Sequence, residues 1–211
     1  MNHKISENAH VADSALVAGS ARVCDSAQVA GSACVYDSAH VAGSACVYDS
    51  AYVAGSACVY DSAHVAGSAR VYDSARVYGS ARVYDSARVY DSARVYDSAR
   101  VYDSAHVGGS ARVYGSAHLS GEGRIEKTSD YLCLGPAISS GRITTAHRDA
   151  KIGVRIHCGC FSGSLAEFRA QIAQTHAKGT PARHQYELFA DVIDAHFALI
   201  DWADDEKIER A

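Results

Sequence analysis

An aliphatic residue occurs at every sixth position from Ile5 to Ile125, and this repeat constrains the fold more than any other feature. Ala stands two positions before the aliphatic residue from Ala9 to Ala117, giving the unit Ser-Ala-x-Val-x-(Gly/Asp). A helix cannot use this pattern, because a six-residue period drifts around its 3.6-residue turn. A strand can, because residues two apart lie on the same side. Each unit is therefore predicted to be one short strand with Ala and Val inward, followed by a turn at Gly or Asp and Ser.

The composition indicates a narrow, regular core. Hydrophobic residues make up 48% of the 211 residues, but they are mostly Ala and Val, with only 4 Phe, 1 Met and 1 Trp. The net charge of -4 does not favour nucleic acid or an anionic membrane as a partner. No segment approaches the roughly 18 apolar residues of a membrane span, and the first ten residues contain no apolar stretch for a signal peptide. Seven Cys, an odd number, do not suggest a disulfide framework. We expect a soluble cytoplasmic protein without a cofactor.

The repeat unit resembles the hexapeptide repeat of left-handed parallel β-helices, and residues 3–126 match it throughout. The resemblance implies left-handed winding with three units per triangular coil, so that 21 units would form about seven coils. It also implies a homo-oligomer, with a trimer favoured. A twelve-residue alternation, VAGSAxVYDSAx, runs through residues 29–68 and leaves a two-sided solenoid with two units per coil as the alternative.

Arg and Tyr flank the repeated Val on the outward positions of residues 70–102. With three units per coil these side chains are predicted to form ladders on the surface. One such ladder comprises Arg76, Tyr78, Arg94, Tyr96, Arg112 and Tyr114. A surface of this kind could hold a glycan, a nucleic-acid strand or another protein. The competing interpretation is a solvated, salt-bridged surface, because residues 70–126 contain 8 basic and 7 acidic residues.

Many hexapeptide-repeat proteins are acyltransferases, in which a loop typically interrupts the coil and a His acts as general base. Here no insertion breaks the phase between Ile5 and Ile125. The candidate bases lie at ordinary outward positions of the repeat, namely His40, His64, His106 and His118. The sequence therefore predicts no catalytic residue, and an acyl-CoA-dependent acyltransferase of the hexapeptide class stays an alternative.

Zinc is the cofactor of some hexapeptide carbonic anhydrases, but the expected ligands do not converge here. His10, His64 and His118 would share one face yet lie three coils apart in turn, about 14 Å, whereas one ion needs ligands at about 2.0–2.1 Å. Three of the Cys residues, Cys34, Cys46 and Cys58, would fall on three different faces. No metal site is predicted. Ice binding is also disfavoured, because no Thr precedes Thr128.

A second domain is predicted to begin near Lys127, where the period stops and Leu, Ile, Phe, Trp and Pro appear. We expect a solenoid over 1–126 and a small α+β domain over 127–211 that caps it with a three-stranded sheet and two helices. The first helix opens at the capping box Ser164-Leu-Ala-Glu167. The predicted elements are strands at 131–134, 142–147 and 152–158 and helices from Ser164 to about Ala177 and from about Arg183 to Trp202, the latter with Tyr186, Phe189, Val192, Ile193 and Phe197 inward.

The stretch GPAISSGRITT…HCGCFSGSLAEF…QTH…QYELF resembles a small domain found at the ends of hexapeptide-repeat proteins in bacterial and phage genomes. The resemblance covers about residues 131–197 and implies no activity. A helix N-terminus at residues 162–164 offers free N–H groups for an anion, and Ser140, Arg142 and Thr144 lie on a nearby turn and the second predicted strand. The residues predicted to bind a small anion such as a nucleotide are Ser140, Arg142, Thr144, Cys160, Ser162, Ser164 and His176.

Three interpretations stay open for Cys158-Gly-Cys160. Strand alternation favours two small core residues on the side of Val154 and Ile156. A metal pair with His176 or His147 and a reactive thiol before a helix are the others.

The sequence thus favours a non-catalytic solenoid scaffold or binding protein, of bacterial or phage kind, with an Arg/Tyr surface and an oligomerisation face. The acyltransferase and an anion-binding C-terminal module are the alternatives.

Overall fold

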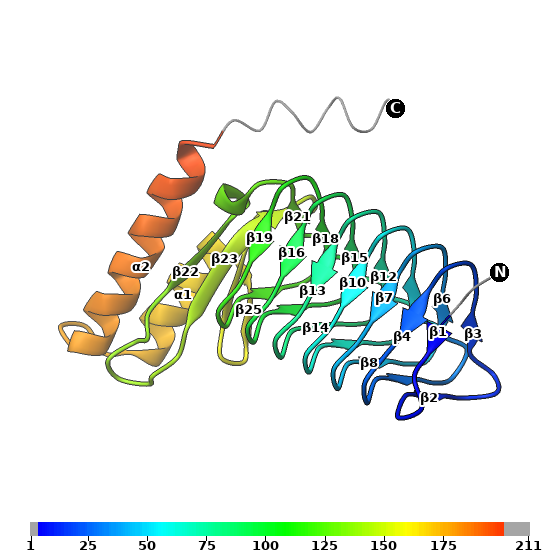
Figure 1. Cartoon of the computed structure of the whole chain (residues 1–211). Coiled ribbons are helices and arrows are strands. Elements are labelled where there is room, and N and C mark those ends of the chain that lie inside the picture. Colours follow the sequence, from blue (N-terminus) through cyan, green and yellow to red (C-terminus); the bar gives the residue numbers. More distant parts are fainter. Residues whose placement is uncertain (1–3, 201–211) are drawn as a thin grey trace. The chain divides into compact units, whose positions relative to one another are not determined.

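The computed structural model describes residues 4–200, a mainly β chain with two helices near its C-terminal end (Figure 1). It divides into two compact units. The solenoid unit extends to Thr128 and includes Asp149–Lys151, and the remaining described residues from Ser129 onward form the second unit.

The solenoid consists of 21 strands of two residues each, wound in coils (Figure 1). They form three parallel sheets of seven strands, with every third strand in the same sheet. One sheet contains β1 (Lys4–Ile5), β4 (Arg22–Val23), β7 (His40–Val41), β10 (Cys58–Val59), β13 (Arg76–Val77), β16 (Arg94–Val95) and β19 (Arg112–Val113). The next contains β2 (His10–Val11), β5 (Gln28–Val29), β8 (Cys46–Val47), β11 (His64–Val65), β14 (Arg82–Val83), β17 (Arg100–Val101) and β20 (His118–Leu119). The third contains β3 (Leu16–Val17), β6 (Cys34–Val35), β9 (Tyr52–Val53), β12 (Arg70–Val71), β15 (Arg88–Val89), β18 (His106–Val107) and β21 (Arg124–Ile125).

The register confirms the three-sided solenoid of about seven coils. Cys58 pairs with Arg76 and Arg76 with Arg94, so each coil contains three of the six-residue units. The two-sided alternative with two units per coil is wrong. The left-handed winding stays a prediction of the resemblance.

The twelve-residue alternation has a different origin. Three twelve-residue units span two coils, so Gly and Asp turns alternate along each corner of the solenoid from Gly19 to Asp85. For example, Asp25, Gly43 and Asp61 occupy the same corner in three successive coils. Beyond Asp85, the alternation is broken: Asp91 follows Asp73 in one corner and Asp103 follows Asp85 in another.

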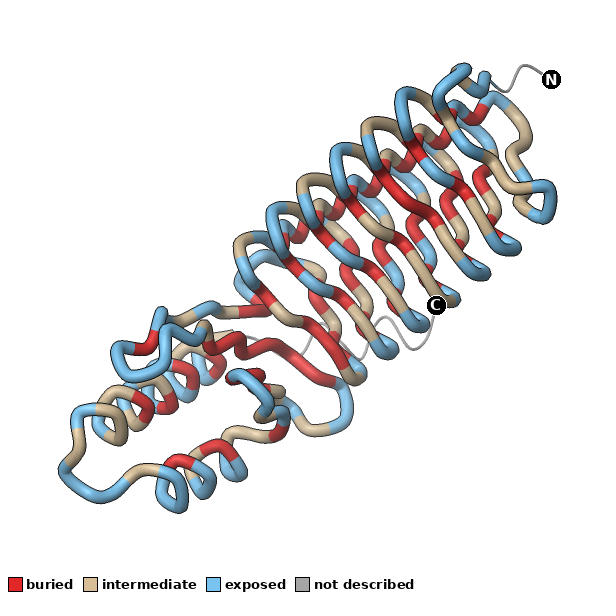
Figure 2. Tube along the Cα trace, turned by 90° about the horizontal axis from the view of Figure 1, so that it is seen from below, coloured by how far each residue is buried: buried red, intermediate tan, exposed pale blue. Residues whose placement is uncertain are grey.

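From Ala21 onward, buried residues follow the inner side of the coils (Figure 2). From Ala21 to Leu119 the inward Ala and Val or Leu side chains are 0% exposed. Ile5 in the first described coil is 41% exposed, because no preceding coil covers it. The core is therefore built from small side chains repeated at the strand spacing, as the sequence pattern predicts.

From Gly19 to Gly121, every corner turn has its Gly or Asp in the left-handed region of backbone conformation, which was predicted for Gly. Nine aspartates have φ between 55° and 60°. Eight of them accept a hydrogen bond from a backbone N–H one coil further on, at 3.0–3.3 Å: Asp25, Asp37, Asp49, Asp61, Asp85, Asp91, Asp97 and Asp103. In the described part of the chain, no ion pair links a turn aspartate to Arg76, Arg94 or Arg112. The salt-bridged surface of the competing interpretation is thus not formed there, since these carboxylates cap turns.

Two glycines of one corner provide a stability test. Both have positive φ, 69° at Gly79 and 65° at Gly115. A Cβ at Gly79 would lie 2.9 Å from the Asp97 backbone nitrogen, whereas a Cβ at Gly115 would meet nothing within 4 Å. We expect Gly115→Ala to cost about 1–2 kcal/mol from backbone strain and Gly79→Ala at least about 1 kcal/mol more, because the coils must also separate. Thermal unfolding followed by circular dichroism measures both, and equal losses would contradict the close approach.

The second unit contains a four-stranded antiparallel sheet in the order β22-β23-β24-β25, and two helices. The elements are η1 (Thr128–Asp130), which begins at the last solenoid residue, β22 (Tyr131–Leu134), β23 (Thr144–Asp149), β24 (Gly153–Cys158), β25 (Phe161–Ser164), α1 (Leu165–Thr175) and α2 (Pro181–Ala198). The predicted three-stranded sheet is wrong by one strand, because no strand was predicted between residue 158 and the helix that begins near Ser164. The capping box of Ser164 and Glu167 is confirmed.

Both helices pack on one face of this sheet. Their shared core contains Ala146 and Ile156 from the sheet, Phe168 and Ile172 from α1 and Tyr186, Ala190, Ile193 and Phe197 from α2. Val192 was predicted to face this core but is 46% exposed, because the buried stripe of α2 follows Tyr186, Ala190, Ile193 and Phe197 and Val192 lies outside it. The predicted helix to Trp202 is too long, because α2 ends at Ala198 with Leu199 as its C-cap; Trp202 itself lies outside the described residues.

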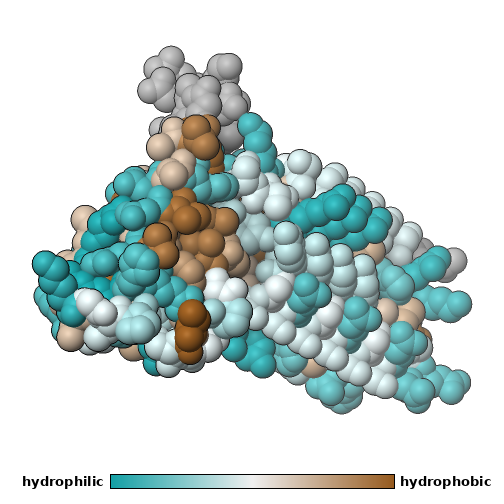
Figure 3. Space-filling view, turned by 90° about the vertical axis from the view of Figure 1, so that its left-hand side faces the viewer, coloured by the Kyte–Doolittle hydropathy of each residue, from teal (hydrophilic) through white to brown (hydrophobic). Residues whose placement is uncertain are grey.

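Apolar residues also gather on the surface of the second unit (Figure 3). Its exposed large apolar side chains are Ile138, Leu188, Val192 and Leu199. In residues 4–200, no helix is long and apolar enough to cross a membrane.

Candidate ligand-binding site

A cavity of about 590 Å³ lies within the second unit. Three parts of the unit line it: the loop before β23, the β24–β25 hairpin, and the ends of α1 and α2 that face them. The lining residues are Ser139, Ser140, Arg142, Cys158, Cys160, Phe161, Ser162, Phe168, Gln171, Ile172, Thr175, His176, Ala182 and Tyr186.

Aromatic and aliphatic side chains form one wall of the cavity. Phe168 and Ile172, which follow the apolar stripe of α1, are 3% and 4% exposed. The rings of Phe161 and Phe168 lie 5.4 Å apart at 44°, and Phe168 meets Tyr186 edge to face at 6.3 Å. This wall offers an apolar surface to a ligand.

Tyr186 joins the apolar wall to the polar groups. Its hydroxyl and that of Ser140 are hydrogen-bonded at 2.8 Å, and the Arg142 backbone N–H donates to Ser140 Oγ at 3.3 Å. Burial raises the pKa of Tyr186, while the hydrogen bond with Ser140 opposes this shift. The phenol is therefore neutral at pH 7 and can both donate and accept.

Arg142 is the cation of the cavity. Its side chain crosses the hairpin turn so closely that a Cβ at Gly159 would lie 2.9 Å from Arg142 Nε. Gly159, with φ of 63°, begins this two-residue turn. Within residues 4–200 the Arg142 guanidinium forms no ion pair, so its donors can meet an anionic group in the cavity.

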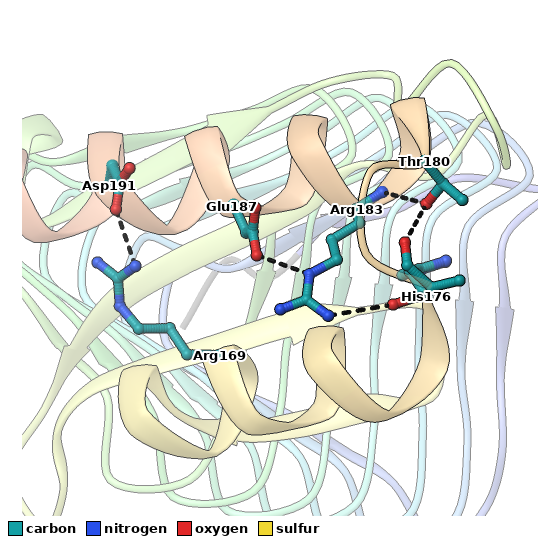
Figure 4. A network of polar contacts seen from close by, with 7 residues as sticks. Arg169, His176, Thr180, Arg183, Glu187 and Asp191 are labelled. Carbon is teal, nitrogen blue, oxygen red and sulfur yellow. Dashed lines mark hydrogen bonds and ion pairs between the residues drawn. The ribbon is translucent and has the colours of Figure 1, made fainter.

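His176 lies at the junction of α1 and α2 (Figure 4) and also lines the cavity. Arg183 donates to the His176 carbonyl oxygen at 3.4 Å and to Glu187 at 2.8 Å, while Thr180 caps α2. The His176 ring stacks on Tyr186 with centroids 5.3 Å apart and planes at 19°. The two helices are further joined by Arg169, which pairs with Asp191 at 2.8 Å and Asp194 at 3.3 Å.

The structure brings five of the seven predicted ligand residues together in the cavity lining: Ser140, Arg142, Cys160, Ser162 and His176. Thr144 and Ser164 do not line it. Thr144 is 0% exposed within β23. Ser164 is engaged with Glu167: its N–H donates to Glu167 Oε2 at 2.7 Å, and its Oγ accepts from the Glu167 N–H at 3.3 Å. The Ser164 N–H is therefore not free for an anion, because the Glu167 carboxylate already accepts its hydrogen bond.

Sequence reasoning missed the aromatic wall as part of a site. The sequence pattern predicted Phe168 and Tyr186 only as core positions of the two helices. Both residues do lie in the core, and they line the cavity as well. Phe161, Gln171 and Thr175 gave no signal, because the hairpin that turns Phe161 toward α1 was not predicted.

The interpretation of Cys158 and Cys160 as two core residues is half wrong. Cys158 is 8% exposed in the core, but Cys160 is exposed in the turn between β24 and β25, where strand alternation stops. In residues 4–200, no group of three His, Cys, Asp or Glu side chains is placed to hold a metal ion.

On the solenoid, Arg76, Arg94 and Arg112 lie in register on neighbouring strands. The rings of Tyr78 and Tyr96 stack at 4.9 Å and 3°, and those of Tyr96 and Tyr114 at 5.4 Å and 19°. Because these rings cover one another, stacking takes up the ring faces that meet. The ladder therefore presents hydrogen-bonding groups and charge, and its role as a binding surface stays a prediction.

The solenoid histidines and cysteines lie where a coil of three units places them. His10, His64 and His118 belong to one sheet and are separated by three coils each, while Cys34, Cys46 and Cys58 belong to three different sheets. Burial, followed by nearby arginines, lowers the pKa values of His106 and His118.

Comparisons with protein-family models, curated proteins and solved structures give no match to this chain. The resemblance to hexapeptide-repeat proteins and the bacterial or phage origin thus stay predictions.

Proposed function

We propose that the second unit binds a small organic anion with an aromatic or aliphatic body, and that the solenoid is a non-catalytic support for this module. The observation that carries the proposal is a cavity of about 590 Å³ lined by both an apolar wall and Arg142, whose guanidinium forms no ion pair within residues 4–200.

The size and lining of the cavity support a small ligand. Ligand sites commonly enclose about 300–1,000 Å³, with apolar walls and a few polar groups that fix orientation. Here the apolar body would contact Phe161, Phe168 and Ile172. The anionic group would meet Arg142, with the hydroxyls of Ser140 and Tyr186 beside it. Carboxylate and phosphate both suit a guanidinium, so a fatty or aryl acid and a nucleotide share the required chemistry.

The hexapeptide acyltransferase is the weaker candidate. The strands of the described solenoid follow one another every six residues without an insertion. A bacterial or phage homotrimer, as the resemblance implies, is compatible with the proposed function and is not needed for it.

Isothermal titration calorimetry of the full chain tests the proposal with 4-phenylbutyrate, adenosine monophosphate and 4-phenylbutanol. We expect at least one of the two anions to bind and the uncharged alcohol to bind at least about tenfold more weakly, because it cannot use Arg142. A bound anion at 100 times its dissociation constant should also stabilise the chain by about 2.7 kcal/mol. Equal affinity for acid and alcohol, or no heat from either anion at millimolar concentration, would contradict the proposal.

A further inference from the structure

A separate cavity of about 320 Å³ lies on the solenoid, where one column of tyrosines is interrupted. The column follows one corner of the coils through Tyr36, Ala54, Tyr72 and Tyr90, which occupy the same position in successive coils. Tyr72 and Tyr90 stack at 5.5 Å and 11°, but at Ala54 the coil has no ring. The interruption follows from the alternation of Tyr-Asp and Ala-Gly turns along a corner.

The small residues at Ala54 and Gly55 leave a slot beside the ring of Tyr72. Ala54, which is 4% exposed, and Gly55 line it, and Tyr52 and Tyr72 border it. Gly55 also keeps its turn close to the next one, since a Cβ there would lie 2.9 Å from the Asp73 backbone nitrogen. A planar ring in the slot could stack on Tyr72, as Tyr90 does on the other side.

The polar lining is charged and balanced, with Arg70, Arg88, Asp37 and Asp73. Asp37 caps the Gly55 N–H at 3.1 Å. Asp73 differs: among the nine left-handed aspartates of the described coils, only its carboxylate accepts no backbone N–H. In the same described residues, the guanidiniums of Arg70 and Arg88 form no ion pair. The slot therefore offers the two carboxylate oxygens of Asp73 as acceptors and the guanidinium N–H groups of Arg70 and Arg88 as donors.

We propose that this cavity binds a guanine base, presented as a free nucleoside or nucleotide. A guanine has two adjacent N–H donors that a carboxylate such as Asp73 can accept together. Its O6 and N7 are acceptors that an arginine can bind with two hydrogen bonds. The base is planar, so it can stack on Tyr72. Adenine lacks the paired N–H donors, and the balanced charges give no preference for a polyanion.

The test is saturation-transfer NMR and calorimetric titration of the full chain with guanosine, which carries no charge and therefore does not use the anion site of Arg142. We expect saturation of the guanosine base proton and an affinity at least about tenfold higher than for adenosine, or about 1.4 kcal/mol. Arg142→Gln should leave guanosine binding unchanged. No saturation of guanosine, or equal affinity for adenosine, would overturn the proposal.

Matched variants locate the binding. Asp73→Asn should weaken guanosine binding at least about tenfold. Asp61→Asn should not, although Asp61 occupies the same kind of turn with φ of 60° against 59° at Asp73. Tyr72→Leu should likewise weaken binding, whereas Tyr84→Leu, which removes the equivalent stack on Tyr102 at 5.2 Å, should not. If each pair of variants lost affinity equally while thermal stability was retained, the assignment to this cavity would be wrong.

Discussion

Val77→Asp is expected to lower the free energy of unfolding of the solenoid by at least about 4 kcal/mol. Val77 is 0% exposed and pairs with Val59 and Val95 in the neighbouring coils. The surrounding inward side chains are Ala and Val, which cannot donate a hydrogen bond to a carboxylate. An aspartate at this position would have to stay protonated in the core or pull the coil open toward water. Because each coil contacts only its neighbours, we expect the loss of structure to begin at this coil.

Arg76→Asp is the matched control, one residue away on the exposed side of the same strand. Surface substitutions of this kind usually change stability by less than about 0.5 kcal/mol. Chemical unfolding followed by circular dichroism compares the two variants, and hydrogen exchange of residues 59–95 locates the opening. If Val77→Asp were as stable as Arg76→Asp, the inward and outward sides of the strand would be misassigned.

Arg142→Gln is expected to weaken binding of the organic anion at least about tenfold, because hydrogen bonds to charged groups contribute roughly 1.5–3 kcal/mol. Glutamine keeps a polar side chain of similar reach and removes only the charge and the guanidinium fork. Titration calorimetry with 4-phenylbutyrate, or with adenosine monophosphate if that is the anion that binds, measures the change.

Lys178→Gln supplies the control for net charge. Lys178 is exposed in the connection between α1 and α2 and does not line the cavity. We expect this variant to bind the anion as the native chain does. Equal losses in Arg142→Gln and Lys178→Gln would indicate a general electrostatic effect instead of a direct contact.

The solenoid could be predicted from the sequence because one residue type recurs at one spacing for more than half of the chain. The inward positions, the turn conformations and the number of coils all follow from that spacing. The role of the turn aspartates could not be predicted in the same way. It depends on contacts one full coil away, which link eight of the nine left-handed aspartates to the next coil and not to the nearby Arg.

The second unit was predictable where local signals are strong, as in the capping box of Ser164 and the strand Tyr131–Leu134. The fourth strand was missed because Phe161–Ser164 is short and contains Ser and Gly, which usually indicate a loop. That strand forms the hairpin with Cys160 in its turn and directs Phe161 to the cavity. Polar site residues could therefore be named from the sequence, but the aromatic wall required the tertiary fold.

The most direct test of the proposed function is methyl NMR of the full chain labelled at the isoleucine δ1 methyl groups, titrated with 4-phenylbutyrate or adenosine monophosphate. Ile172 lines the cavity, while Ile125 is buried at the end of the solenoid and does not. We predict a saturable shift of the Ile172 methyl resonance, with the resonance of Ile125 unchanged. Two outcomes of the titration would contradict a ligand site in the second unit. In one, other isoleucine methyl resonances shift while that of Ile172 does not; in the other, no isoleucine methyl resonance shifts with either anion.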